Sequence, residues 1–148
     1  MQQATGFETA GHCEGVALAA LAEREGTPLH VYSSAALRER IGGLQSALFG
    51  LDATICYAVK ANSNEAILRL MAQAGVGADI VSGGELWRCL RAGIPAQRIV
   101  FSGVGKRADE IAQALDAGVA RLNVESREEL ELVQVIAAGR GAVARVSV

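Results

Sequence analysis

Short apolar runs alternate with amphipathic segments along most of this chain. The centres of the runs lie about 20 to 23 residues apart, which is the spacing of successive β-strand and α-helix units. We predict strands at residues 54–59, 78–82, 99–102, 121–124 and 143–148. Parallel strands joined by helices form a sheet that is covered by helices, so this pattern indicates an α/β fold.

The helices between these strands are marked at both ends. An Ala-Gly pair closes each predicted helix, and glycine favours the left-handed conformation that ends a helix. These glycines are Gly75, Gly93, Gly118 and Gly139. Ser126 and Glu129 have the spacing of a capping box, and Asn62 and Asn64 supply N-caps before the helix that begins near Glu65.

Two further helices precede this series, at residues 15–25 and 34–49, with an extended segment at 27–32. We therefore divide the chain into a helical lead-in, residues 1–26, and a β/α domain, residues 27–148. Glycine at positions 42 and 43 weakens the middle of the second helix.

The first predicted strand favours one kind of α/β architecture. Cys56, Ala58 and Lys60 share one face of it, and the larger side chains share the other. Small residues suit the crowded interior of a barrel, so we predict part of a (β/α)8 TIM barrel, with an open doubly wound sheet as the alternative. A complete barrel needs about 250 residues. Because the chain stops within a strand-like run, we expect a piece of a longer protein or a chain that needs a partner.

Composition excludes several classes of function. Hydrophobic residues make up 51% of the chain, charged residues 20%, and the net charge is -2. There is no basic excess for nucleic acid, and no apolar stretch reaches the roughly 18 residues that a membrane span needs. The first residues lack the basic and apolar regions of a secretory signal. Three widely spaced cysteines indicate neither a metal site nor disulfides, which favours reduced thiols and a cytoplasmic location.

Lys60 is the most informative single residue. The chain has two lysines and twelve arginines, and Lys60 closes the apolar run that begins at Ile55. An amine that is desolvated at a strand end is chemically useful, because a lowered pKa frees its lone pair for Schiff-base formation. The ordinary alternative is a strand-end lysine that reaches solvent, which spacing alone favours.

Other polar residues also lie in or just after the apolar runs. In α/β folds the carboxyl edge of the sheet carries ligand chemistry. Ser82 also suits the role of a helix cap. The residues in question are Lys60, Asp79, Ser82, Glu85, Lys106, Asn123, Glu125 and Arg145.

Four ordered motifs resemble one family of enzymes. Residues 57–62 (YAVKAN) are similar to the cofactor-lysine motif of the fold-type III pyridoxal-phosphate decarboxylases, which act on ornithine, diaminopimelate or arginine. Residues 77–86 (GADIVSGGEL) are similar to the second signature of that family. Residues 99–106 (IVFSGVGK) and 122–126 (LNVES) resemble the branch that acts on diaminopimelate. The resemblance runs from about residue 27 to residue 148 and implies an alanine racemase-like barrel.

The resemblance also implies a cofactor and a site. Pyridoxal 5′-phosphate would be bound covalently by Lys60, and an amino-acid substrate would lose its carboxylate there. Asp79 and Glu85 would lie near the lysine, and Arg145 would face the cofactor region from the end of its strand. The full-length protein would be a homodimer whose active site is completed across the interface. The family's phosphate-binding loop, ring-nitrogen glutamate and stacking histidine have no counterpart in these residues.

Several alternatives remain at this level. The substrate could instead be ornithine, arginine or a carboxylated polyamine. Alanine racemase shares the fold and a similar lysine motif, but its lysine motif normally continues with Tyr-Gly-His, whereas Asn62-Ser63-Asn64-Glu65 follows here. A protein that binds pyridoxal phosphate or a partner without catalysis is the alternative from another class.

Overall fold

The computed structural model describes residues 7–8 and 11–148, which divide into two compact units. The units are Met1–Leu51 and Asp52–Val148. The predicted division after residue 26 stays a prediction, and part of the predicted lead-in, residues 1–6 and 9–10, lies outside the described residues.

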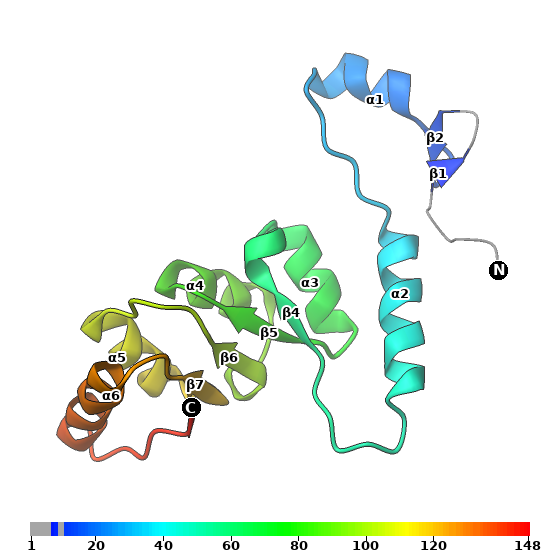
Figure 1. The fold of residues 1–148 in the computed structure, drawn as a ribbon. Coiled ribbons are helices and arrows are strands. Elements are labelled where there is room, and N and C mark those ends of the chain that lie inside the picture. The colour runs from blue at the N-terminus through cyan, green and yellow to red at the C-terminus, as the bar shows by residue number, and fades with distance from the viewer. Residues whose placement is uncertain (1–6, 9–10) are drawn as a thin grey trace. The chain divides into compact units, whose positions relative to one another are not determined.

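The first unit contains a small antiparallel sheet and two helices (Figure 1). The helix predicted at 15–25 begins only at Leu18, because the two residues before it pair with the preceding strand. The helix predicted at 34–49 is confirmed over most of its length. The elements are β1 (Phe7–Glu8), β2 (His12–Cys13), β3 (Val16–Ala17), α1 (Leu18–Glu25) and α2 (Ser34–Ala47).

The Glu14 carboxylate connects the small sheet to the start of α2. It accepts hydrogen bonds from the Ser33 hydroxyl at 2.7 Å and the Ala35 backbone N–H at 2.9 Å. These bonds, that from Ala35 above all, hold the pKa of Glu14 below its usual value. The connection explains why α2 belongs to the same unit as the N-terminal strands.

The second unit is a parallel sheet with a helix between each pair of successive strands (Figure 1). Its strands are β4 (Cys56–Ala58), β5 (Gly77–Ile80), β6 (Ile99–Phe101), β7 (Arg121–Asn123) and β8 (Val146–Ser147). Its helices are α3 (Glu65–Gln73), α4 (Gly83–Ala92), α5 (Ala108–Ala117) and α6 (Arg127–Gly139), with short 3₁₀ turns η1 (Val59–Ala61) and η2 (Ala96–Arg98). All five predicted strands are confirmed.

The order of these strands supports a barrel. Each strand pairs with its neighbour in the sequence, from β4 through β8, and every pairing is parallel. A doubly wound sheet reverses its strand order at a switch point, and this sheet has no reversal. The predicted α/β class with part of a TIM-type barrel is thereby confirmed in its parallel, sequential topology.

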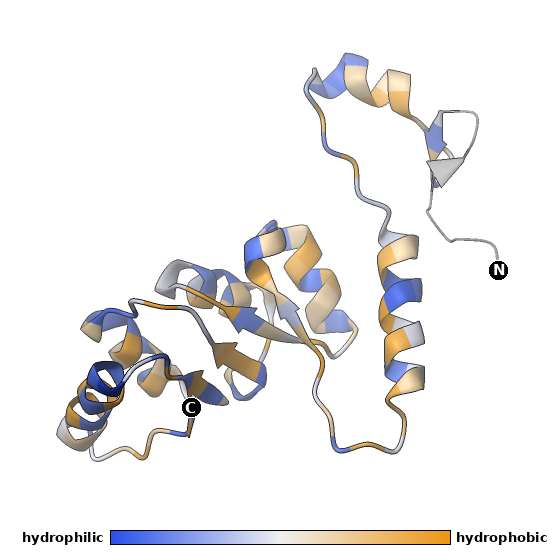
Figure 2. Ribbon diagram, viewed as in Figure 1, coloured by the Kyte–Doolittle hydropathy of each residue, from blue (hydrophilic) through white to orange (hydrophobic). Residues whose placement is uncertain are grey.

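The two faces of the sheet differ in burial. One face carries the apolar core. Apolar side chains of the helices are buried there together with the core residues of the strands, which are almost fully buried: Ile80, Ile99, Phe101 and Leu122. Figure 2 shows β6 as a hydrophobic strand and the first turn of α6 as hydrophilic. The other face, here called the open face, is only partly buried and carries Cys56, Asp79, Val100, Asn123 and Ser147.

Most of the predicted helix ends are confirmed. Gly93 and Gly118 are left-handed C-caps, and the Asn64 side chain accepts a hydrogen bond from the Ala66 N–H at 2.9 Å. The prediction for Gly139 is wrong, because α6 includes this residue and the positive φ of 61° falls at Gly141.

Candidate functional site

The carboxyl ends of neighbouring strands bring the candidate residues together. Lys60 follows β4, Asp79 lies in β5, and Asn123 ends β7. Because the strands are parallel, these positions meet at one edge of the sheet. We call this the carboxyl edge. The sheet register places Ala58 opposite Asp79, so Lys60 lies just beyond that pair, and its turn η1 contacts β5.

Lys60 presents an accessible amine. It lies in η1, is exposed, and makes no hydrogen bond or ion pair within the part of the chain that the structure describes. The segment after it is well fixed, because the Tyr57 hydroxyl donates to the Asn62 carbonyl oxygen at 3.1 Å. Asn62 in turn accepts from the Asn64 N–H at 2.9 Å. The backbone around Lys60 is therefore ordered while its ammonium is free to bind a ligand.

Asp79 is part of a hydrogen-bonded row. The Ser102 hydroxyl donates to the Asp79 carboxylate, and the Asn123 amide donates to the Ser102 oxygen at 2.9 Å. We call these three residues the polar row. It crosses from β5 to β7 on the open face. Ser102 was not among the predicted site residues, although it directly follows the buried strand β6 and belongs to one of the four motifs.

Lys106 has a different environment from Lys60. Its side chain is 1% exposed and its ammonium forms an ion pair with Glu129 at 2.5 Å. It also donates to the backbone oxygens of Gly103 at 2.8 Å and Asn123 at 2.6 Å. With all three of its N–H groups used, Lys106 is a structural residue and not a second reactive amine.

Glu85 is engaged at the start of α4. Its carboxylate accepts from the Val81 N–H at 2.7 Å, and its own N–H donates to the Ser82 hydroxyl at 3.2 Å. The cap predicted at Ser82 is confirmed. The same arrangement recurs at α6, where Glu129 accepts from the Glu125 N–H at 3.2 Å. Glu85 therefore stabilises the loop beside the carboxyl edge, and its role toward a cofactor stays a prediction.

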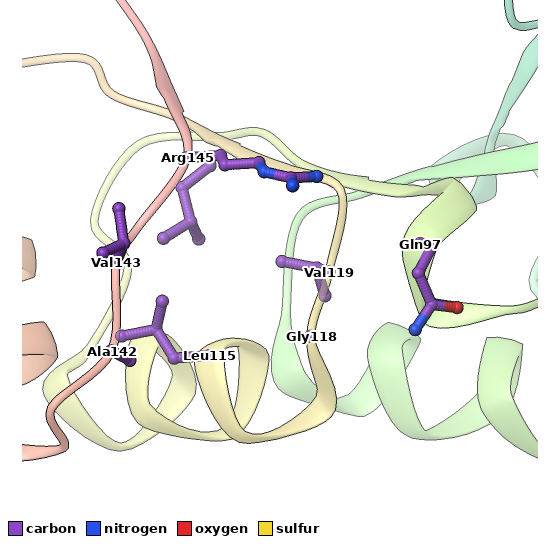
Figure 3. Close-up of a pocket in the computed structure, with 8 residues that line it drawn as sticks. Gln97, Leu115, Gly118, Val119, Ala142, Val143 and Arg145 are labelled. Carbon is purple, nitrogen blue, oxygen red and sulfur yellow. The ribbon is translucent and has the colours of Figure 1, made fainter.

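Arg145 lies directly before the last strand. Its backbone oxygen accepts from the Leu122 N–H, before β8 begins at Val146. Its side chain lines a pocket with residues that precede β6 and β7, including Gln97 and Val119 (Figure 3). This is the amino edge of the sheet, opposite the edge that carries Lys60. The run 143–148 forms a strand only in its last part, and the role of Arg145 toward a cofactor stays a prediction.

Cys56 and Cys89 have surroundings that raise the pKa of a thiol. Burial, and then the negative charge of Asp79, raise the pKa of Cys56, while burial and the charge of Glu85 raise the pKa of Cys89 to about 11. Cys13 is also free and buried. A raised pKa disfavours the nucleophilic thiolate, which agrees with the interpretation of Cys56 as a small packing residue.

The donors at the carboxyl edge fit pyridoxal phosphate. An unpaired primary amine is the group that binds an aldehyde covalently, and a carboxylate on the neighbouring strand can compensate positive charge there. The described residues hold no cluster of three or more His, Cys, Asp or Glu side chains that could bind a metal. No helix within the described ranges is long and apolar enough to cross a membrane.

Fold and site together define a barrel-type β/α domain with one accessible lysine at its carboxyl edge. The chain belongs to the family described as pyridoxal-dependent decarboxylase, pyridoxal binding domain, whose model matches residues 34–148. The family resemblance and the predicted cofactor class are thereby confirmed.

Curated relatives carry a more specific name. The chain is 49% identical over 135 residues to diaminopimelate decarboxylase of Aquifex aeolicus and 51% identical over 134 residues to that of Pseudomonas aeruginosa. These matches cover 91% and 90% of this chain but 32% of each relative. The chain thus spans about a third of the length of these proteins.

Solved structures give the same result. The structure of Helicobacter pylori diaminopimelate decarboxylase complexed with L-lysine matches with a TM-score of 0.83 and 45% identity, over 87% of this chain and 33% of that one. The structure of AQ1208 from Aquifex aeolicus matches with a TM-score of 0.88 and 46% identity, over 95% of this chain and 35% of that one. The described fold is therefore that of the corresponding third of these proteins.

Proposed function

We propose that this chain forms the lysine-bearing part of a pyridoxal-phosphate-dependent decarboxylase that converts meso-diaminopimelate to L-lysine and CO2. The observation that carries this proposal is the free amine of Lys60 at the carboxyl edge, in a chain about half identical to diaminopimelate decarboxylases. Pyridoxal phosphate, when bound, supplies the electron sink for loss of the carboxylate.

The residues of this chain have distinct parts in the proposal. Lys60 would hold the cofactor covalently through the nitrogen of its side-chain amine. The backbone beyond it is fixed by Tyr57 and Asn62. Asp79 places a carboxylate on the strand beside Lys60. The cofactor phosphate and most substrate contacts are assigned to parts of the complete protein beyond these residues.

The diaminopimelate assignment is preferred over other substrates of the family. A viral arginine decarboxylase structure is 25% identical with a TM-score of 0.67, and a Vibrio vulnificus lysine/ornithine decarboxylase structure is 26% identical with a TM-score of 0.72. Both similarities are well below that to the Helicobacter pylori diaminopimelate decarboxylase. From the family resemblance we also infer that the complete protein is a homodimer. We infer a cytoplasmic location because the three cysteines are free thiols, which suit a reducing compartment.

The complete protein provides the test. We expect a cofactor absorbance band near about 420 nm, and CO2 release from meso-diaminopimelate but not from ornithine or arginine. Lys60→Ala and the charge-conserving Lys60→Arg should lose both, because neither side chain binds an aldehyde. If either variant retains the band, Lys60 is not the cofactor lysine. Release of CO2 from ornithine or arginine in preference would overturn the substrate assignment.

A further inference from the structure

The hydrogen bonds of the polar row have a fixed direction. An amide nitrogen only donates and a carboxylate only accepts, so Asn123 donates to Ser102 and the Ser102 hydroxyl must give its proton to Asp79. The row therefore ends on the Asp79 carboxylate. A carboxylate that accepts such a bond is held in one orientation.

Lys106 fixes the backbone beneath the row. Its ammonium binds the carbonyl oxygens of Asn123 and of Gly103, the residue after Ser102. Both donors of the row are thus attached, through the main chain, to one buried cation. That cation is in turn held by Glu129 at the start of α6. The position of the Ser102 hydroxyl is therefore determined by β6, β7 and α6 together.

The row is not needed to complete the secondary structure. The hydroxyls of Ser33, Ser82 and Ser126 each cap a helix by accepting from a backbone N–H. Among the residues that the structure describes, the Ser102 hydroxyl, in contrast, bonds only with side chains of the neighbouring strands. Its bonds lie on the open face and orient a charged group, which indicates a role at the site.

We propose that Ser102 and Asn123 are positioning residues, which hold the Asp79 carboxylate at the carboxyl edge beside Lys60 so that it acts on the cofactor bound there. This inference rests on the proposed function of Lys60. Neither residue touches the cofactor in this scheme. Both act through Asp79, and loss of either donor leaves the carboxylate free to turn.

The test measures cofactor affinity of the complete protein, by titrating its cofactor-free form with pyridoxal phosphate and following absorbance. Ser102→Ala should raise the dissociation constant about tenfold, the size of one hydrogen bond to a charged group. Ser102→Thr keeps the hydroxyl and should stay within about twofold of the wild type. Asn123→Asp, which has the same shape but no donor, should behave like Ser102→Ala.

A double-mutant cycle shows whether the effect passes through Asp79. In an Asp79→Asn background, Ser102→Ala should change the dissociation constant by less than about twofold. Ser126→Ala is the control, because it also removes a serine hydroxyl but the hydrogen bond that it loses belongs to a helix cap. It should lower thermal stability and leave cofactor affinity unchanged.

The outcomes separate the two proposals. An unchanged dissociation constant in Ser102→Ala, or an equal change with and without Asp79, overturns the positioning role. The same holds if Ser126→Ala weakens cofactor binding as much as Ser102→Ala does. Failure of the proposed function is distinct from these results, because Lys60→Ala would then retain the cofactor band.

Discussion

The ion pair of Lys106 and Glu129 offers the sharpest test of stability. The two side chains are 1% and 9% exposed, and the ammonium also binds two backbone oxygens. Lys106→Met leaves a buried carboxylate without its cation and two carbonyl groups without their donor. Breaking a buried pair in this way costs about 3–5 kcal/mol. That is a large part of the roughly 5–15 kcal/mol that stabilises a domain.

The assay is urea unfolding of the complete protein, followed by circular dichroism. Lys106→Met should strongly lower the urea concentration at the unfolding midpoint. The m-value, which is the slope of the unfolding free energy against urea concentration, should change little. The double variant Lys106→Met with Glu129→Leu should recover part of the loss, because no charge is left unpaired. Arg127→Met is the control on the same helix, since the Arg127–Glu131 pair is 86% and 64% exposed and contributes about 0.3–0.5 kcal/mol.

The comparison between the buried and the exposed ion pair tests whether the buried pair stabilises the fold. If Lys106→Met shifts the midpoint no more than Arg127→Met, the hydrogen bonds of Lys106 do not stabilise this fold. If the double variant is less stable than Lys106→Met alone, an unpaired charge is not the cause of the loss.

Three further results are expected from the same structure. Gly77→Ala should lower the free energy of unfolding in urea by about 1–3 kcal/mol, because the added Cβ would lie 2.3 Å from the Arg98 carbonyl oxygen. Gly84→Ala is the control and should be tolerated, because the atom nearest to its added Cβ lies at 3.8 Å. Cys89, with a pKa of about 11, should react with iodoacetamide at pH 8 only in the unfolded protein, so rapid labelling of the folded form would contradict its burial. The lowered pKa of Glu14 means that its contribution to stability is present above its unfolded pKa and is lost as pH falls through the folded pKa. Glu14→Gln should therefore flatten the acid limb of a thermal-unfolding profile, and an unchanged limb would show that its bonds to α2 do not matter.

Local sequence signals located most of the elements. The apolar runs at 99–102 and 121–124 differ from β6 and β7 by a single residue at the end, because buried parallel strands are short and apolar throughout. The caps at Asn64 and Ser126 were also predicted, since capping depends on residues only a few positions apart. Lys60 was found in the same way, as a cation that closes an apolar run.

The predicted bounds of secondary structure were wrong where the local sequence suits more than one conformation. The run 143–148 is apolar enough to be a strand throughout, but the structure has a strand only at Val146–Ser147, and Arg145 just before it contributes its backbone oxygen to the Leu122 N–H of β7. Val16 and Ala17 suit a helix by composition, but they pair with β2 instead. In both cases the register of a neighbouring strand, which local sequence does not contain, decided the outcome.

The sequence by itself determined the alternation of strands and helices, the parallel architecture and the place of Lys60 at a strand end. These follow from hydrophobic periodicity and capping, which act over one or two turns of chain. Only the tertiary structure decided that Lys106 is buried and that Asp79, Ser102 and Asn123 form one row. Their separations along the chain are long, and hydrogen bonds between them exist only once the parallel register has brought three strand ends to the same edge.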